Sequence, residues 1–388
     1  MCSSRQIAAI PGLALACLLG THSAQVNAAP AEAASPAPAH LRIVAYVTNW
    51  SMPAVIHPEK LTHINLAFAH IDDHGRAVFD QPAVAADNLK TLRALKQKNP
   101  ALKILVSVGG WMADGFSDAA LTDASRRTFA RSAVDLLHRY SLDGIDIDWE
   151  YPGQGVAGIK YRPEDKEHFT LLLKALREQL DAARDVQQRR PRDRYLLTIA
   201  SADREYFDHT EMNVLHVYLD WINIMSYDFF NSLTATTGHH AGLYRAASAA
   251  ETDRNVDASV RQHLAAGIPP GKLSVGVPFY GRGFAGVEPL QSGLHQRYER
   301  YEGDHSYAEL AEKLIGKQDF VRYWDDRAQA PYLWSSTARI FVSYDDPRSI
   351  AVKARYVLEH RLGGVMIWEL SQDRDDELLD VIASTLPH

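Results

Sequence analysis

Three acidic residues, Asp146, Asp148 and Glu150, alternate with apolar residues in the stretch DGIDIDWE (residues 143–150). In a β-strand, side chains two positions apart share a face, so a strand here would place the three acids side by side. Neighbouring carboxylates raise one another's pKa, and at least one of them should hold a proton near neutral pH. A carboxyl group that stays protonated is what a general acid requires. The spacing therefore predicts a site for acid–base catalysis.

Two other interpretations of the acids remain open. Carboxylate oxygens bind calcium or magnesium, although the 12-residue calcium loop with its central glycine is missing and no HExxH pair occurs among the 17 histidines. The acids could also form a structural polar network in a protein core. We expect catalysis, with no metal and no cofactor.

The elements that must position these acids recur along the chain. Short runs rich in Val, Ile and aromatic residues are typical of strands, and there are eight of them: 42–47, 63–69, 103–110, 144–149, 195–201, 221–227, 273–281 and 363–369. Amphipathic segments between several runs predict helices at 88–98, 125–140, 163–184 and 256–266. This alternation favours an α/β fold, the closed (β/α)8 TIM barrel. An open doubly wound sheet is the alternative, and the lack of a dinucleotide-binding glycine pattern after the first run weakens it.

The interval between the seventh and eighth runs is far longer than any other. We expect residues 284–340, approximately, to form a small α+β insertion between strand 7 and strand 8. In a barrel of this kind the loop after a strand opens on the face that carries the active site. Glu150, at the end of the fourth strand, would lie on that same face. We expect the catalytic barrel to span residues 41–388.

The first 40 residues predict export. Arg5 precedes an apolar stretch (7–20) and small residues lead up to Ala28, which is typical of a secretory signal peptide over residues 1–28. An uncleaved anchor, or a lipoprotein signal at Cys17, is the alternative. Residues 29–40 predict an Ala/Pro linker. We expect a secreted protein, extracellular or periplasmic, that has no membrane contact after signal cleavage.

Composition and charge narrow the classes of partner. The 388 residues are 46% hydrophobic and 23% charged, as in ordinary globular proteins. A net charge of -7 disfavours nucleic acid and anionic membranes as partners. The only two cysteines, Cys2 and Cys17, precede the expected cleavage site, so the mature chain would contain no disulfide. We expect a monomer.

The acidic stretch resembles the signature of the family 18 glycoside hydrolases, the chitinases and their relatives, at all eight positions of DGIDIDWE. Further stretches resemble other motifs of that family: YVTNW (46–50), SVGGW (107–111), MSYD (225–228), VPFYGR (277–282), FVSYDD (341–346) and MIWELSQD (366–373). The resemblance extends over residues 41–388, which is nearly all of the expected mature chain.

The resemblance implies a retaining hydrolysis of β-1,4-linked N-acetylglucosamine polymers without an enzymic nucleophile, an exception to the usual two-carboxylate scheme. Glu150 would protonate the glycosidic oxygen while the substrate's own 2-acetamido oxygen attacks the anomeric carbon, giving an oxazolinium intermediate. Asp148 would orient the acetamido N–H, Asp146 would share a proton with Asp148, and Tyr227 would donate to the acetamido oxygen. The implied partners are chitin and N-acetylglucosamine oligosaccharides.

The resemblance also implies residues that contact the sugar or support the acids. Tryptophans at the ends of strands would stack on the apolar face of a pyranose: Trp368 at subsite −1, Trp111 at +1 and Trp50 towards the non-reducing end. Other positions match substrate contacts of the family, namely Met225, Asp228, Tyr280 and Arg282. Tyr46 and Ser107 match residues that support the inner Asp pair.

Several residues are expected to lie outside this set. We expect Trp149 and Trp221 in the core. His239 and His240 are interpreted as exposed loop histidines without a role. Phe230, with Asn231 after it, departs from the family pattern after MSYD, so the shape of the subsites there stays open.

Two other functions also remain open. One is a hydrolase of the same family that acts on glycoprotein or cell-wall glycans. The other is a chitin-binding, lectin-like protein, although such proteins lack the acid that Glu150 supplies here. Endo or exo cleavage is likewise open.

Overall fold

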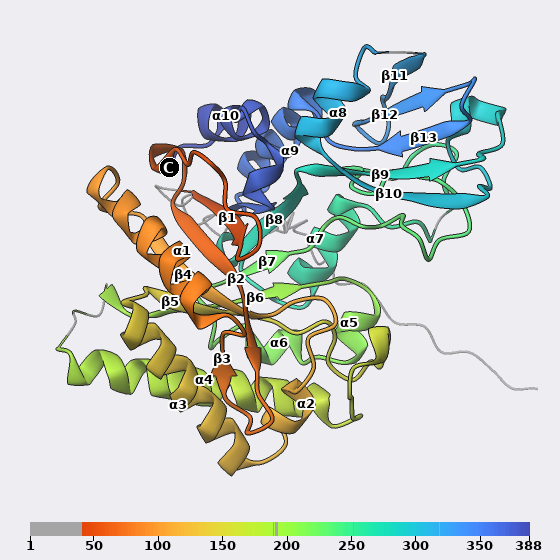
Figure 1. Cartoon of the computed structure of the whole chain (residues 1–388). Helices are drawn as coiled ribbons and strands as arrows, with labels where there is room; N and C mark the ends of the chain where they lie inside the picture. Colours follow the sequence, from red (N-terminus) through yellow and green to blue (C-terminus); the bar gives the residue numbers. More distant parts are fainter. Residues whose placement is uncertain (1–40, 189, 191–192, 251, 318) are drawn as a thin grey trace, which may run out of the picture. The chain divides into compact units, whose positions relative to one another are not determined.

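The protein is described by a computed structural model that covers residues 41–188, 190, 193–250, 252–317 and 319–388 (Figure 1). The expected signal peptide and Ala/Pro linker lie outside the described residues. Within the described ranges, no helix combines the length and the apolar character needed to cross a membrane.

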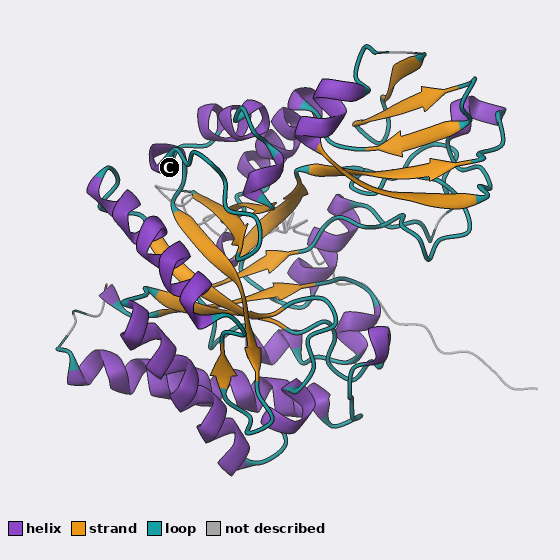
Figure 2. Cartoon of the chain, in the orientation of Figure 1, coloured by secondary structure: helices purple, strands orange, loops and turns teal. Residues whose placement is uncertain are grey.

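Eight parallel strands of the described chain form a closed barrel with helices around it (Figures 1 and 2). They are β1 (Arg42–Thr48), β2 (His63–Ile71), β4 (Lys103–Gly109), β5 (Gly144–Asp148), β6 (Leu196–Ser201), β7 (Trp221–Ile224), β8 (Leu273–Pro278) and β14 (Gly364–Trp368). The barrel closes because β1 pairs with β2 on one side and with β14 on the other. A short strand, β3 (Ala77–Val78), adds antiparallel to β2. This confirms the predicted (β/α)8 barrel and excludes the open doubly wound sheet.

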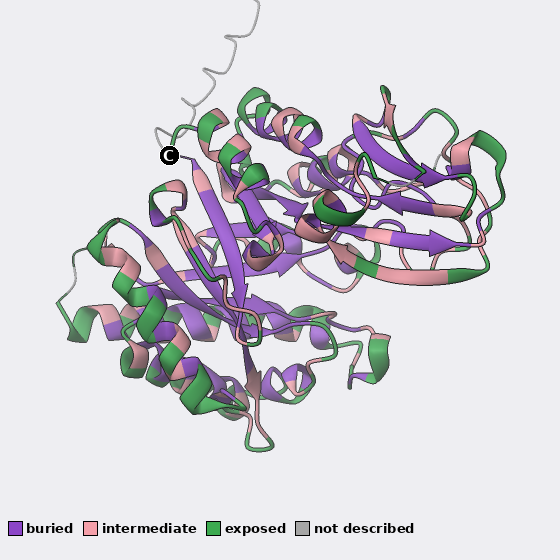
Figure 3. Ribbon diagram, turned by 45° about the horizontal axis from the view of Figure 1, so that its top comes forward, coloured by how far each residue is buried: buried purple, intermediate pink, exposed green. Residues whose placement is uncertain are grey.

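The period of two along β5 separates an apolar face from an acidic face. Ile145 and Ile147 are fully buried in the core between the barrel and its helices. Trp149 belongs to the same core and stacks on Phe116, with ring centroids 5.2 Å apart. The alternate residues of β5 therefore face the barrel interior. Figure 3 shows most of the barrel strands in the colour of buried residues.

The long helices are α1 (Pro82–Ala94), α3 (Asp123–Tyr140), α4 (Asp165–Val186), α7 (Val256–Ala265), α9 (Pro347–Glu359) and α10 (Glu377–Thr385), and the short ones are α2 (Phe116–Ala119), α5 (Glu205–Asp208) and α6 (Met212–Leu215). Some of the helices begin at capping residues, for example α3, α7 and α9. Thr122 and Ser125 form a capping box at the start of α3. The first helix begins six residues before the expected range 88–98, because Pro82 occupies its first position, which favours Pro. It also ends earlier, in a 3-10 turn (Leu95–Gln97).

The segment between β8 and β14 carries a second, antiparallel sheet. Its elements are β9 (Tyr280–Ala285), β10 (Arg300–Ser306), α8 (Tyr307–Lys313), β11 (Phe320–Asp325), β12 (Ala330–Ser335) and β13 (Ile340–Ser343), with the strand order β10-β9-β13-β12-β11. The sheet has a small core of its own, in which Phe284, Trp334 and Phe341 are buried. Only Phe279 separates β8 from β9, so this sheet starts directly at the end of a barrel strand.

A buried ion pair fastens the return from this sheet to the barrel, and its loss should be costly. Lys353 of α9 and Asp345 are 0% and 1% exposed and form an ion pair, and Ser349 Oγ donates to Asp345 at 2.7 Å. Lys353→Met would leave the Asp345 carboxylate buried and unpaired, so we expect the free energy of unfolding to fall by about 3–5 kcal/mol in a urea titration. Lys313→Met removes an exposed pair with Glu309 and should leave the unfolding midpoint unchanged. Equal midpoints for the two variants would contradict this expectation.

Candidate active site

Strand β5 places two of the three acids inside the barrel and the third just beyond its carboxyl end. Asp146 and Asp148 are 0% and 3% exposed, and Glu150 follows two residues after the strand. Strands β4 and β5 approach closely here: a Cβ at Gly109 would lie 1.9 Å from the backbone oxygen of Asp148, and Gly109 has a φ of +120°. Glycine is therefore required at this position of the SVGGW stretch.

Asp146 is surrounded by donors from four other strands. Tyr46 Oη and Ser107 Oγ each donate to its Oδ2 at 2.7 Å. Thr198 Oγ1 donates to its Oδ1, and Asn223 Nδ2 lies 3.5 Å from the same oxygen. Burial raises the pKa of Asp146, and these hydrogen bonds oppose the rise. Both carboxylate oxygens of Asp146 are therefore committed to the scaffold.

Asp148 differs because one of its oxygens is unpaired. Among the described residues, no group donates a hydrogen bond to its Oδ1. Burial raises the pKa of Asp148 well above its usual range, and the adjacent charges of Glu150 and Asp146 raise it further. Asp148 is thus the member of the trio that has a free acceptor and a high proton affinity.

Glu150 has the pKa of a general acid. Burial of its carboxyl raises the pKa to about 7, with a hydrogen bond to Tyr151 opposing the rise and the charge of Asp228 adding to it. A carboxyl with a pKa near the working pH can both give and take a proton. The trio therefore contains one fixed acid, one with a free oxygen and one with a proton to transfer.

The MSYD stretch lies immediately after β7 and is anchored to β8. Ser226 Oγ donates to Gly276 O at 2.9 Å and accepts from Gly276 N at 3.0 Å. Tyr227 is 7% exposed and belongs to the aromatic cluster inside the barrel, beside the partly buried Met225. Its pKa is raised well above the usual range by burial and by the charges of the acids, first that of Asp148. Tyr227 thus keeps its O–H as a donor.

Asp228 is held by residues of the second sheet. Arg282 of β9 forms a fork on it, with Nε 2.8 Å from Oδ1 and Nη2 2.6 Å from Oδ2. Tyr280 Oη donates to Oδ1 at 2.7 Å. Burial alone would raise the pKa of Asp228, but His240 and Arg282 together hold it well below its usual range. Asp228 is therefore a fixed negative charge.

The three tryptophans expected to contact sugar differ in exposure. Trp368 is partly buried, stacks on Phe68 with ring centroids 5.7 Å apart, and contacts Tyr46 at 5.4 Å. Trp111 and Trp50 are 54% and 69% exposed. Large exposed aromatic rings beside a buried acid cluster are typical of ligand-binding surfaces.

Comparison with known proteins decides the family. The chain matches the family model of glycosyl hydrolases family 18 over residues 42–373. It belongs to this family. Over 97% of its length it is 38% identical to Chitinase A1 of Niallia circulans, and it spans 62% of that protein. It is 34% identical to Chitotriosidase-1 of Mus musculus, over 86% of this chain and 73% of that one. A solved family 18 N-acetylglucosaminidase from Paenibacillus barengoltzii is 42% identical, with a TM-score of 0.84, over 89% of this chain and all of that one.

This family 18 hydrolase has site residues that the sequence did not single out. Thr198 and Asn223, which contact Asp146, are polar residues at alternate positions of otherwise apolar runs, and that pattern could have identified them. Phe68, which supports Trp368, lies where the pairing of β2 with β4 shifts register. Such an irregularity changes which face a side chain takes and leaves no mark in the sequence.

The interpretation of His239 and His240 as exposed loop histidines is wrong. Their exposed fractions are 5% and 0%, because the loop that carries them packs under the second sheet: His240 N donates to Ser343 Oγ at 2.9 Å. Phe230 is also buried and stacks on His295 at 5.7 Å. Asn231 Nδ2 donates to the backbone oxygen of Asp228 at 3.1 Å, so it helps to hold the backbone of Asp228 in place. Trp221 is buried inside the barrel, as expected.

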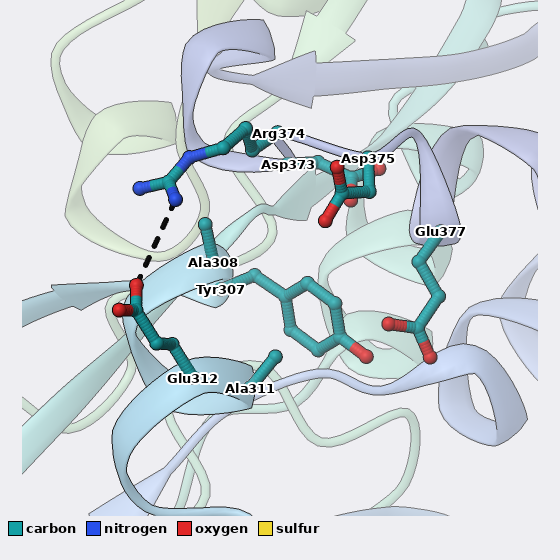
Figure 4. A pocket seen from close by; sticks show the side chains of 8 residues that line it. All are labelled: Tyr307, Ala308, Ala311, Glu312, Asp373, Arg374, Asp375 and Glu377. Atoms are coloured by element: carbon teal, nitrogen blue, oxygen red, sulfur yellow. Dashed lines mark ion pairs between the residues drawn. The ribbon is translucent and has the colours of Figure 1, made fainter.

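A hollow elsewhere in this hydrolase is unrelated to the acids. Figure 4 shows Tyr307 and Glu312 of α8 on one side of it and Asp373, Arg374 and Glu377 on the other. The hollow has a volume of about 270 Å³. Glu312 and Arg374 form an ion pair of 3.7 Å across it. None of the expected site residues lines this hollow. In the part of the chain that the structure describes, no group of three His, Cys, Asp or Glu side chains is placed to hold a metal ion.

The exposed ring of Trp111 permits a test of sugar stacking. If the ring of Trp111 covers a sugar rather than protein, Trp111→Ala should raise KM for a chitin hexamer about tenfold, equivalent to about 1.4 kcal/mol. Since Trp111 is more than half exposed, the melting temperature should not change. Met112→Ala, at the neighbouring exposed position, should leave KM unchanged. A lowered melting temperature with an unaltered KM would assign Trp111 to the fold.

Proposed function

We propose that this glycoside hydrolase is a chitinase, which cleaves β-1,4 linkages in chitin and in N-acetylglucosamine oligomers. The observation that carries the proposal is the unequal environment of the three acids: Asp146 is fully hydrogen-bonded, Asp148 has a free oxygen, and Glu150 has a pKa of about 7. Sites whose carboxyl groups have been set to different pKa values are typical of paired acid and orienting roles.

In the proposed first step Glu150 gives its proton to the glycosidic oxygen. Its pKa keeps it protonated up to about neutral pH, and it lies at the carboxyl end of a barrel strand, where the loops can admit a polymer. As the bond breaks, the 2-acetamido oxygen of the sugar at −1 attacks the anomeric carbon. The resulting oxazolinium ion carries the positive charge, and Glu150, now a carboxylate, activates the water that opens it.

Asp148 and Tyr227 act on the acetamido group. The free Oδ1 of Asp148 accepts the amide N–H, which turns the acetamido oxygen towards the anomeric carbon and places a negative charge beside the developing cation. Tyr227, a neutral phenol with an O–H to donate, binds the acetamido oxygen. Asp146 shares a proton with Asp148 as the charge develops, because only one proton is favourable between two neighbouring carboxyls. When Asp146 holds that proton, one of its hydroxyl partners must turn from donor to acceptor.

The aromatic residues supply positioning. Trp368 forms the floor at −1 and is held in place by Tyr46 and Phe68. Trp111 and Trp50 extend the track on either side. Asp228, Met225, Tyr280 and Arg282 contact the sugar next to Glu150, and Ser107 with Tyr46 fixes Asp146.

The experiment that tests the function is a product profile. Wild-type protein is incubated with chitin hexamer and, separately, with a high-mannose glycoprotein, and the products are followed over time by mass spectrometry. Release of N-acetylglucosamine oligomers supports a chitinase. If only the glycoprotein is cleaved, with release of its glycans, the protein is a glycan hydrolase instead. Binding of the hexamer without cleavage would indicate a lectin-like protein.

The same profile addresses a second candidate, an N-acetylglucosaminidase. The solved enzyme of that name is 42% identical to this chain, and the match covers the whole of that enzyme. If the first product from the hexamer is the monosaccharide, the enzyme releases single sugars from a chain end. If dimers and trimers appear first, it cleaves as a chitinase.

We also propose that the protein is exported and that residues 1–28 are removed. The support is the charged residue, apolar stretch and small residues at the start of the chain. Amino-terminal sequencing of protein secreted by the producing cell should begin at residue 29. Mature protein that begins at Met1 would contradict it.

A further inference from the structure

A histidine that the proposed mechanism does not use lies beside the site. His240 is fully buried, and its Nδ1 is 3.6 Å from Oδ1 of Asp228. Within the described residues, neither of its ring nitrogens has a hydrogen-bond partner. A buried polar group left unpaired is destabilising, so such a group is expected to have a role or an acceptor within reach. Asp228 is the acceptor that this ring approaches.

The surroundings of His240 hold the ring against Asp228. Its backbone N–H donates to Ser343 Oγ at 2.9 Å, and its backbone oxygen accepts from Phe229 N at 3.0 Å. The ring also packs on Tyr280, with centroids 5.3 Å apart. The imidazole is thereby anchored from three segments and is not a loop side chain that could swing into solvent.

Burial keeps the ring neutral. Burial lowers the pKa of His240, and the charge of Arg282 of β9 lowers it further. The charges of Asp228 and of Asp345, after β13, raise the pKa and oppose this effect. A neutral imidazole has one N–H and one acceptor nitrogen, and the hydrogen bond it makes decides which nitrogen carries the proton. A carboxylate facing Nδ1 selects the tautomer with the proton on Nδ1.

We propose that His240 is a positioning residue for the reaction: its neutral imidazole donates the Nδ1–H to Asp228 and fixes that carboxylate in orientation towards Glu150 and the sugar. Arg282 and Tyr280 hold Asp228 from the β9 side, and His240 closes the third side. The side chain of Asp228 remains 32% exposed, which leaves it open to a substrate hydroxyl. This inference rests on the proposed function, because the reaction is the one assigned above.

The first test compares two substitutions at this position. His240→Leu removes the donor, and it should lower kcat on a chromogenic chitobioside about tenfold with KM within twofold. It should also move the alkaline limb of the rate profile to lower pH, because a loosened Asp228 acts less strongly on Glu150. His240→Asn keeps a donor close to the position of Nδ1, and it should restore both kcat, to within threefold, and the limb.

The neighbouring histidine supplies a matched control. His239 is also buried and has its own carboxylate, Asp325 of β11, 3.2 Å from Nε2. His239→Leu should leave the alkaline limb where it is in the wild type. The proposal would be overturned if His240→Leu kept the kcat and the alkaline limb of the wild type. Equal losses of kcat in His240→Leu and His240→Asn would also overturn it, since either result would mean that the Nδ1–H has no role.

A second measurement is made on the wild-type protein. Nitrogen-15 spectra of the wild-type protein with labelled histidine should show a neutral ring protonated on Nδ1 for His240, assigned by its loss in His240→Asn or by specific labelling. A ring protonated on Nε2 would overturn the proposal. A wild-type protein that does not cleave the chitobioside would refute the proposed function, and the tautomer would still decide the hydrogen bond.

Discussion

Glu150→Gln is expected to lower kcat on chitin oligomers by at least about 10²–10⁴-fold, which is the usual worth of general acid–base assistance. Glutamine has nearly the same shape but no proton to give, and it cannot become the base of the second step. Binding of chitin hexamer, measured by calorimetry, should persist, since the aromatic platforms are untouched. The matched control is Glu164→Gln, an exposed residue before α4, which should have wild-type kcat. Substantial turnover by Glu150→Gln would mean that the proton comes from another group.

The same carboxyl sets the pH range of activity. The general acid must be protonated before the reaction, and burial raises the pKa of Glu150 to about 7. We therefore expect kcat/KM to be sustained at mildly acidic pH and to fall as pH rises through about 7. A profile of initial rates on a chromogenic chitobioside from pH 4 to 9 measures this, and a rate that stays constant to pH 9 would contradict it.

The second large effect concerns the substrate. If the nucleophile is the acetamido oxygen, fully deacetylated chitosan should not be cleaved at all, even where it binds. Asp146 and Asp148 cannot replace it, because Asp146 is occupied by four donors and Asp148 is committed to the amide. Mixed chitosans should be cut only where an acetylated sugar occupies −1. Sequencing the new reducing ends measures this directly, and frequent deacetylated ends would rule out substrate assistance.

Two further experiments test the role of Asp148 independently of the family resemblance. A thiazoline analogue of the cyclic intermediate should inhibit more strongly than the substrate binds, because the site favours the charged species. Asp148→Asn should keep oligomer binding but lose turnover, since an amide can touch the acetamido group without balancing its charge. An unchanged kcat in Asp148→Asn would assign the orientation of the amide elsewhere.

The sequence was sufficient to predict those parts of the structure that follow from local periodicity. The alternation of acids in β5 depends only on the period of a strand, and the eight apolar runs correspond to the eight barrel strands. Residues whose surroundings depend on distant segments could not be predicted. His240 is buried only because the second sheet covers its loop through Ser343. Phe68 faces Trp368 only because β2 breaks its register against β4. Neither condition is encoded near the residue it affects.

The donors around Asp146 make the order of the active site depend on the assembly of the barrel strands. Its partners Tyr46, Ser107, Thr198 and Asn223 come from β1, β4, β6 and β7, while the acid itself comes from β5. A chain that has formed its helices and half of its strands still has a solvated carboxylate at position 146 and no ordered trio. We therefore expect a refolding chain to stay inactive until β1, β4, β6 and β7 have assembled around the acid of β5.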